Sequence, residues 1–454
     1  MWQSLTSRET VFPLINFIRM YSIKERLLPI IDRLRKSPLF KDSMWSLIGS
    51  TIGRGLSLVA GILVARFLGK EIYGEYGIIK TTLIYIEIFS TFGLGYTATK
   101  FIADFRQSYP GRVSSVCRAT LKITLATSGI MAIVVLLFAK QIAIMIDAPH
   151  LYNTLRITAV GVILNAINVA QIGILSGFGD FKVIAKNTTI AGVVTFFLTI
   201  VLTYYWGLNG AVIALVLSYG CQCLINILSV HYRLCQFEAP KERDKGLYKE
   251  LLVFSSPVAL QESLYSIVNW AISFMLIKVS GYGELGLYSA AAQWSAIISF
   301  IPGILRNVTL SHLSGNLNNQ SAHEKTMRAM LGVNLASTSI MMLFILLFIN
   351  PICSMYGDTF EGLKLVIVAQ AFCAIVTSLS NVYAQEFMSR GANWPVFFCR
   401  LVRDVAALLI SYFVIIIVQG YGALILSLSL VISNILYLVA LYYLYKQQQR
   451  KRDK

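Results

Sequence analysis

The chain has 454 residues, of which 56% are hydrophobic and only 13% are charged. A soluble domain usually carries about 25% charged residues, so this composition excludes a water-soluble globular protein and makes lipid the main solvent of the surface. The net charge of +17 would suit a nucleic-acid-binding protein. However, the basic residues lie between apolar segments and at the termini rather than in one patch, so we expect no nucleic-acid partner.

The first 43 residues are a mixed, basic leader without the pattern of a secretory signal peptide. Apolar residues recur from Ile18 to Ile31 among basic ones. This pattern fits an amphipathic helix on the inner leaflet and equally fits a partly ordered cytoplasmic tail.

Apolar segments long enough to cross a bilayer follow one another along the rest of the chain. A spanning helix needs about 20 mostly apolar residues. Twelve segments meet this requirement: 44–68, 74–98, 119–145, 153–177, 187–206, 209–232, 251–280, 286–310, 328–350, 364–389, 396–418 and 421–445. The sequence therefore predicts an all-α polytopic membrane protein with twelve transmembrane helices.

The Lys and Arg residues divide unequally between alternate connections of this arrangement. Of the 39, 31 fall on the side that holds both termini, six fall on the other side, and Arg54 and Lys80 lie inside spans. Positive residues are enriched in cytoplasmic loops, so both termini are expected in the cytoplasm.

Several sequence features recur at a shift of 212 or 213 residues. The pattern Gly-x4-Gly-x-Tyr occurs at 69–76 and at 281–288, and Asn168-Val169 recurs as Asn381-Val382. This repetition predicts two six-helix lobes of the same orientation, related by a pseudo-two-fold axis along the membrane normal. The expected organisation is a leader (1–43), a first lobe (44–232), a cytoplasmic linker (233–250), a second lobe (251–446) and a basic cytoplasmic tail (447–454).

Few ionisable residues lie within the spans, and they are the candidates for function because charge in lipid needs a cavity or a partner. They are Arg54, Lys80 and Glu87 in the first lobe, and Glu262 and Arg306 in the second. A shift of 212 carries Arg54 to within one turn of Glu262. These charges either line a central cavity or form a buried ion pair between the lobes, and both interpretations remain open. Glu87 and Glu262 are also candidates for ion coupling.

Polar residues accompany these charges on two later spans. Gln261 and Asn269 belong to the span 251–280, and Asn381 belongs to 364–389. They indicate a wet, cavity-facing surface or hydrogen bonds between helices. Glu386 and Arg390 are spaced i,i+4 near a cytoplasmic end, and we expect them to form a surface pair that contributes little. The seven cysteines and four histidines are dispersed, so we expect no metal site and no cofactor.

Two segments carry a resemblance to a known family. They are Val64-Ala-Arg-Phe-Leu-Gly-Lys-Glu-Ile-Tyr-Gly-Glu-Tyr76 and Thr91-Phe-Gly-Leu-Gly-Tyr-Thr-Ala-Thr-Lys100. They resemble the polysaccharide transporters, the Wzx-type O-antigen flippases of the MOP superfamily, which also holds the MATE exporters and the lipid II flippase. The resemblance extends over roughly residues 44–446.

The resemblance implies a two-lobed, MATE-like fold and a non-enzymatic function. Members flip undecaprenyl-diphosphate-linked oligosaccharides from the inner to the outer leaflet, for lipopolysaccharide or other surface polysaccharides, by alternating access. Arg54, Lys80 and Arg306 could supply the cations for the diphosphate, since a guanidinium can bind its oxygens with two parallel hydrogen bonds. The resemblance also implies a location in the bacterial inner membrane. The implied partners are the lipid-linked oligosaccharide and the bilayer, with a polysaccharide polymerase and a chain-length regulator as further candidates.

Two alternative functions remain at this stage. A MATE-like ion-coupled exporter of drugs or metabolites would require an acidic cavity, whereas the charges within the spans lean basic. A membrane-embedded polysaccharide polymerase or ligase would require catalytic residues on a long outer loop, whereas the predicted outer connections are short.

Overall fold

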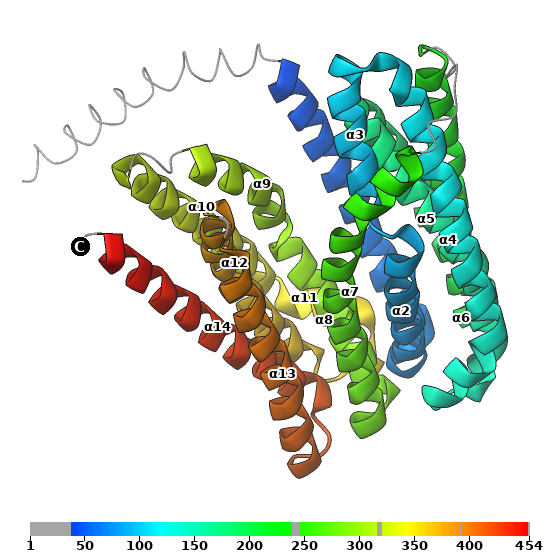
Figure 1. The fold of residues 1–454 in the computed structure, drawn as a ribbon. Helices are drawn as coiled ribbons and strands as arrows, with labels where there is room; N and C mark the ends of the chain where they lie inside the picture. The colour runs from blue at the N-terminus through cyan, green and yellow to red at the C-terminus, as the bar shows by residue number, and fades with distance from the viewer. Residues whose placement is uncertain (1–37, 238–245, 316–319, 391, 453–454) are drawn as a thin grey trace, which may run out of the picture.

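The computed structural model describes the backbone of residues 38–237, 246–315, 320–390 and 392–452. Every regular element in these ranges is a helix (Figure 1). In chain order they are α2 (Pro38–Thr91), α3 (Leu94–Ser108), α4 (Pro110–Met145), η1 (Pro149–Leu151), α5 (Tyr152–Phe178), α6 (Phe181–Leu234), α7 (Leu247–Ser280), α8 (Tyr282–Ile298), α9 (Phe300–Gly315), α10 (Gln320–Leu347), α11 (Ile349–Tyr356), η2 (Asp358–Phe360), α12 (Leu363–Ser389), α13 (Asn393–Ile417) and α14 (Gly422–Arg452). The all-α membrane fold is confirmed, and the predicted amphipathic stretch of the leader lies outside the described residues.

Seven described helices are long and apolar enough to cross a membrane. Two of them, α2 and α6, each contain a pair of predicted spans, because Gly69 (φ 71°) and Gly207 (φ 54°) interrupt the helical backbone. Glycine adopts such positive φ values without steric cost, so each of these residues reverses the chain between two spans. The three remaining predicted spans correspond to α7, to α8 with α9, and to α13, and the total of twelve stays a prediction.

Two predicted spans are interrupted in the structure. The span predicted at 74–98 ends at Thr91, where Phe92 (φ 47°) and Gly93 (φ 68°) adopt left-handed conformations before α3 begins. The span predicted at 286–310 breaks at Ser299, between α8 and α9. Pro302 follows this break, and proline can neither donate a backbone hydrogen bond nor fit inside a regular helix without a kink.

The two halves of the chain share an apolar core at one end only. The turns at Gly69, Gly207, Gly281 and Gly357 mark this end, which we call the glycine-turn end. The core around Leu68 combines buried residues of the first half with those of α8, α11 and α12. At the opposite end, which we call the terminal end, one core belongs to α3–α7 and two separate cores belong to α9–α14. The helices of the two halves accordingly diverge toward the upper edge of Figure 1.

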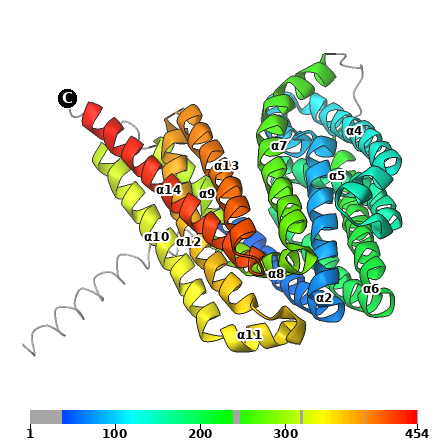
Figure 2. The ribbon, with the colours of Figure 1, turned by 90° about the horizontal axis from the view of Figure 1, so that it is seen from below.

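The helix α7 follows the first half along most of its length, although the repeat assigns it to the second. Near the terminal end, Ser255 shares a 2.6 Å hydrogen bond with Thr97 of α3, and Glu250 lies 3.5 Å from the Arg112 guanidinium of α4. Only toward its glycine-turn end does α7 contact α13, where the Ser411 hydroxyl lies 3.7 Å from the Met275 sulfur. Figure 2 shows α7 beside α2, on the side of the first half.

Candidate transport site between the two halves

The two halves cross most tightly where the repeated glycines meet. A Cβ atom on Gly74 of α2 would lie 1.9 Å from the carbonyl oxygen of Tyr282, and one on Gly286 of α8 would lie 2.0 Å from the carbonyl oxygen of Lys70. Both distances are far too short for a methyl group, so only glycine permits this approach of the two backbones.

These contacts are reciprocal at the shift of 212 residues. Gly74 corresponds to Gly286, and Lys70 corresponds to Tyr282, so each half presents the same positions to the other. Gly77 likewise faces its own counterpart Ser289, with a Cβ atom on the glycine placed 2.7 Å from the serine Oγ. Such self-complementary pairing is expected around a two-fold axis, and we place the pseudo-two-fold axis of the repeat at this crossing.

Polar contacts close the same end. The Gln293 amide donates a hydrogen bond to the Tyr73 hydroxyl, and its side chain fills the space left by Gly61. The Lys278 ammonium at the end of α7 lies 2.6 Å from the carboxylate of Asp147, beyond the end of α4. The glycine-turn end is therefore held by backbone packing and by hydrogen-bonded side chains.

A carboxylate supports this closure within the second half. Glu284 at the start of α8 accepts a 2.6 Å hydrogen bond from the backbone N–H of Ala423, at the N-terminus of α14. Burial raises the pKa of Glu284, while this hydrogen bond and the charge of Lys70 act in the opposite direction. The favourable dipole at a helix N-terminus makes this a stable position for a carboxylate.

An aromatic cluster joins α2 and α7 between the two ends. The Trp270 indole N–H donates a 3.1 Å hydrogen bond to the Thr82 hydroxyl. Its ring stacks on Tyr85 with centroids 5.7 Å apart and on Phe274 at 5.1 Å. These contacts fix the Trp270 face of α7 against the second segment of α2, around Thr82 and Tyr85.

The structure places two of the three predicted cations on α2 and the third on α9, which packs against α12 and α10. Arg54 and Lys80 lie on the two segments of α2, before and after Gly69, and Arg306 lies on α9. The Lys80 side chain is exposed, and none of the described side chains hydrogen-bonds its ammonium group. The side chains of Arg54 and Arg306 fall outside the described residues, so their convergence on one cavity remains a prediction.

Of the predicted acidic and polar residues, the structure describes the side chains of some but not of others. Glu87 is half-buried in the first half, and the side chain of Asn165 of α5 lies near it. Asn269 on α7 is half-buried, and Asn381 on α12 is exposed. Glu262 and Gln261 lie on α7, but their side chains are outside the described residues.

Sequence reasoning missed a chain of buried amides in the first half. The Asn187 side chain donates to Asn226 at 2.9 Å, and Asn226 donates to Asn168 at 2.8 Å. These three residues link α5 to both segments of α6. The sequence signal was available, since asparagine recurs within three apolar spans, but its pairing depends on how the helices pack.

A second polar network corrects an expectation. Glu386 and Arg390 do not form a surface pair, because the Glu386 side chain is fully buried and that of Arg390 is only 18% exposed. They meet His323 of α10, which is also buried. The i,i+4 spacing was correctly identified, but the spacing alone could not show that α9, α10 and α14 cover this face. Among the described residues, no group of three or more His, Cys, Asp or Glu is arranged to hold a metal ion.

Comparison with known proteins identifies relatives along most of the chain. The profile of the family described as "Polysaccharide biosynthesis protein" matches residues 39–308. The EPS I polysaccharide export inner membrane protein EpsE of Ralstonia nicotianae is 24% identical over 401 residues, covering 84% of this chain and 87% of EpsE.

Solved structures share the fold. An inward-facing multidrug resistance MATE family transporter of the MOP superfamily superposes with a TM-score of 0.73 at 16% identity, covering 89% of this chain and 98% of that one. The lipid II flippase MurJ, in an inward closed conformation, superposes with a TM-score of 0.72 at 14% identity, covering 89% of this chain and 87% of MurJ. These likenesses confirm the MATE-like architecture expected from the sequence.

Proposed function

Because the chain belongs to the polysaccharide biosynthesis protein family, a family of multi-pass membrane transporters, we propose that it flips an undecaprenyl-diphosphate-linked oligosaccharide from the inner to the outer leaflet. The observation that carries the proposal is the one-ended closure of the two halves at Gly74 and Gly286, combined with a family match that includes this crossing. A transporter closed at one end and separated into two cores at the other is built for alternating access.

The orientation follows from charge. The terminal end holds most of the basic residues, so we assign it to the cytoplasm. The glycine-turn end then faces outward and is the closed one. In this state a head group would enter from the cytoplasmic leaflet, between α2 and the helices of the second half, while its lipid tail remains in the bilayer.

The cations on α2 and α9 suit the proposed substrate. A diphosphate needs compensating positive charge when it leaves water, and Arg54, Lys80 and Arg306 are the basic residues within the spans predicted to face the interface. Arginine can bind two phosphate oxygens at once, whereas lysine acts as a point charge. Arg54 is therefore assigned to the diphosphate, and exposed Lys80, which lies nearer the glycine-turn end of α2, is assigned to the later part of its route.

A deletion strain tests this function through its lipid-linked sugars. Complete undecaprenyl-linked units should accumulate on the inner leaflet when the chain is absent. Accumulation of single units on the outer leaflet would instead indicate a polymerase or ligase. Unchanged lipid-linked sugars together with a new sensitivity to cationic drugs would indicate an exporter of the MATE type, and either result would overturn the proposal.

Single variants in the complemented strain test the site. Arg54→Ala should abolish export of the polysaccharide, and Arg54→Lys should retain part of it because the charge remains but the paired hydrogen bonds do not. Lys140→Ala is the matched control, since Lys140 is an exposed cation of α4 outside the proposed route. Full activity of Arg54→Ala at normal expression would show that the diphosphate is bound elsewhere.

A further inference from the structure

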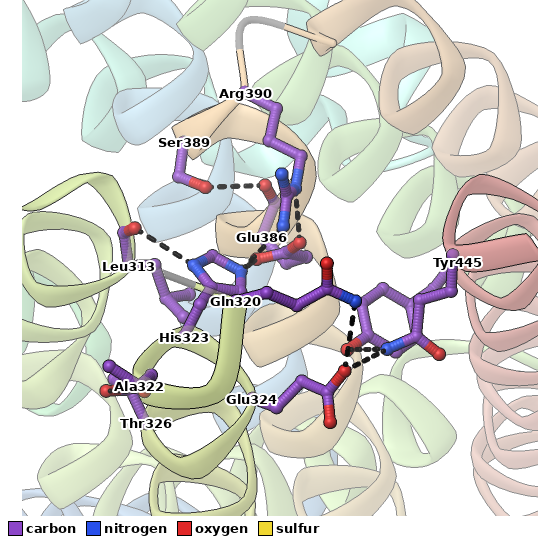
Figure 3. A network of polar contacts seen from close by, with 11 residues as sticks. Leu313, Gln320, Ala322, His323, Glu324, Thr326, Glu386, Ser389, Arg390 and Tyr445 are labelled. Carbon is purple, nitrogen blue, oxygen red and sulfur yellow. Dashed lines mark hydrogen bonds and ion pairs between the residues drawn. The ribbon is translucent and has the colours of Figure 1, made fainter. Parts of the chain in front are cut away.

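Three ionisable side chains are buried together near the terminal end of the second half, where α9, α10 and α12 meet (Figure 3). The Glu386 side chain is fully buried and that of His323 is 3% exposed. Arg390, at the end of α12, closes the cluster. We call Glu386, His323 and Arg390 the triad. Burial of three ionisable groups is costly unless their charges and hydrogen bonds compensate each other.

The contacts within the triad leave one proton to be placed. The Arg390 Nε donates to Glu386 Oε1 at 2.5 Å, and its Nη2 lies 2.9 Å from His323 Nε2. His323 Nε2 also lies 2.5 Å from Glu386 Oε2, and His323 Nδ1 lies 3.2 Å from the Leu313 carbonyl oxygen. Because a carbonyl can only accept, Nδ1 carries a proton.

The other ring nitrogen, Nε2, can form a hydrogen bond with only one of its two neighbours at a time, and its protonation decides which. If Nε2 has a lone pair, it can accept from Arg390, but it then faces the lone pairs of Glu386 Oε2. Arginine does not release its proton in proteins, so it cannot resolve this conflict. A proton on Nε2 lets His323 donate to Glu386 Oε2 in place of accepting from Arg390, and it changes the charge of the triad from zero to +1.

The surroundings do not neutralise this added charge directly. On α10, Glu324 is engaged by Arg328 at 3.2 Å and belongs to a neighbouring network with Gln320 and Gln449. On α14, Tyr445 lies near enough to sense the charges of Glu386, Glu324 and Arg390, and Tyr383 of α12 adjoins it. The triad therefore has one carboxylate of its own and one more distant carboxylate, Glu324, among the described side chains.

We propose that the triad is a proton-binding site, in which Glu386 and His323 share one proton taken from the cytoplasmic side. With the proton bound, the imidazole joins the Leu313 carbonyl of α9 to the carboxylate of α12. Without it, the His323–Glu386 contact is lost and His323 can retain only its bond to Arg390. Proton binding thus controls how firmly α9 and the start of α10 are attached to α12.

The attachment of α9 and α10 to α12 lies in the second half, which must move relative to the first during alternating access. Arg306 is on α9, two turns before Leu313, so a change in the position of α9 also moves a predicted substrate cation. This consequence rests on the proposed function. It predicts that flipping depends on cytoplasmic pH and that the dependence requires both His323 and Glu386.

The proton can be observed without any substrate. The full chain, labelled with ¹⁵N-histidine and reconstituted in liposomes, should show the His323 resonances passing from the imidazolium form to the neutral form between about pH 5 and pH 8. His323→Gln assigns the signal by its disappearance. In Glu386→Gln, which keeps the shape of the side chain but cannot share a proton, His323 should stay neutral over this range. Exposed His231 is the internal control, and its resonances should be the same in every variant.

Two outcomes would overturn the proposal. His323 resonances that do not change between these pH values would make the triad a fixed structural contact. An unaltered His323 titration in Glu386→Gln would show that the two residues do not share the proton.

Flipping of a lipid-linked oligosaccharide by the same liposomes separates this inference from the proposed function. The wild type should show a pH-dependent rate, and Glu386→Gln should show a flattened profile. A titrating His323 in a chain that flips nothing would refute the flippase and leave the proton site intact. Normal flipping together with His323 resonances that do not change with pH would support the flippase and refute the proton site.

Discussion

The crossing at Gly74 offers a sharp test of how the two halves are held together. In Gly74→Ala the new methyl group would lie 1.9 Å from the Tyr282 carbonyl oxygen. Ordinary contacts between carbon and carbonyl oxygen begin at about 3.3 Å, so α2 and α8 must separate by about 1.4 Å. Because the obstruction is backbone, no side-chain rotation can relieve it. Overpacking of this kind costs about 1–3 kcal/mol.

This cost falls only on the state that is closed at the glycine-turn end. A difference of about 1–3 kcal/mol shifts the balance between two conformations roughly 5- to 150-fold. The expected result is a larger population open at this end and a reduced rate of flipping. Gly286→Ala should have the same effect, since its methyl group would lie 2.0 Å from the Lys70 carbonyl oxygen.

Distances between spin labels can measure this shift. Labels at Tyr205 and Tyr421 report on the glycine-turn end, because both side chains are well exposed and belong to different halves. The labelled chain would carry no other cysteine and must first restore polysaccharide export. Gly129→Ala is the control, since no atom lies within 4 Å of its new methyl group. An unchanged distance distribution and full export in Gly74→Ala would refute the reasoning, as would an equal shift in the control.

Two further variants rank the other contacts. Lys278→Met removes the contact with Asp147 and should shift the distances between the spin labels by less than Gly74→Ala does. Both charges are partly exposed, and such pairs contribute about 0–1 kcal/mol. A larger shift than that of Gly74→Ala would contradict this ranking. Asn226→Ala should lower the free energy of unfolding by about 1–3 kcal/mol, because the buried oxygen of Asn168 loses its donor and the Asn187 amide keeps only its hydrogen bond to Ser229. Thermal unfolding in detergent should detect the loss, whereas unchanged stability would show that the Asn168 oxygen finds another partner.

The sequence predicted the elements that depend on local chemistry. Apolar length located the spans, and the structure shows that Gly69, Gly207 and Gly281 adopt the positive φ values at the reversals between them. The pattern shared by residues 69–76 and 281–288 predicted two related halves. The structure adds the physical reason for that pattern, because Gly74 and Gly286 are the positions at which the two backbones touch.

The candidate site was less accessible to sequence reasoning because its residues meet only through packing. His323 and Glu386 are 63 residues apart, and their contact requires α10 to lie against the end of α12. Lys80 lies in an apolar segment, yet its side chain is exposed, and a linear pattern does not tell which neighbour a helix face meets. Burial of Glu386 is likewise a property of the helices that cover it and not of its own segment.

Residues at corresponding positions of the repeat have different surroundings in the two halves. Asn168 and Asn381 occupy corresponding positions, but Asn168 is buried in the amide chain of the first half and Asn381 is exposed. The contacts at the crossing obey the shift of 212 residues, whereas the polar interiors do not. A carrier needs symmetric backbones where its halves pivot, but it needs only one half to respond to an ion. We therefore expect variants at the crossing to act equally in both halves, and variants of the triad to have no counterpart in the first.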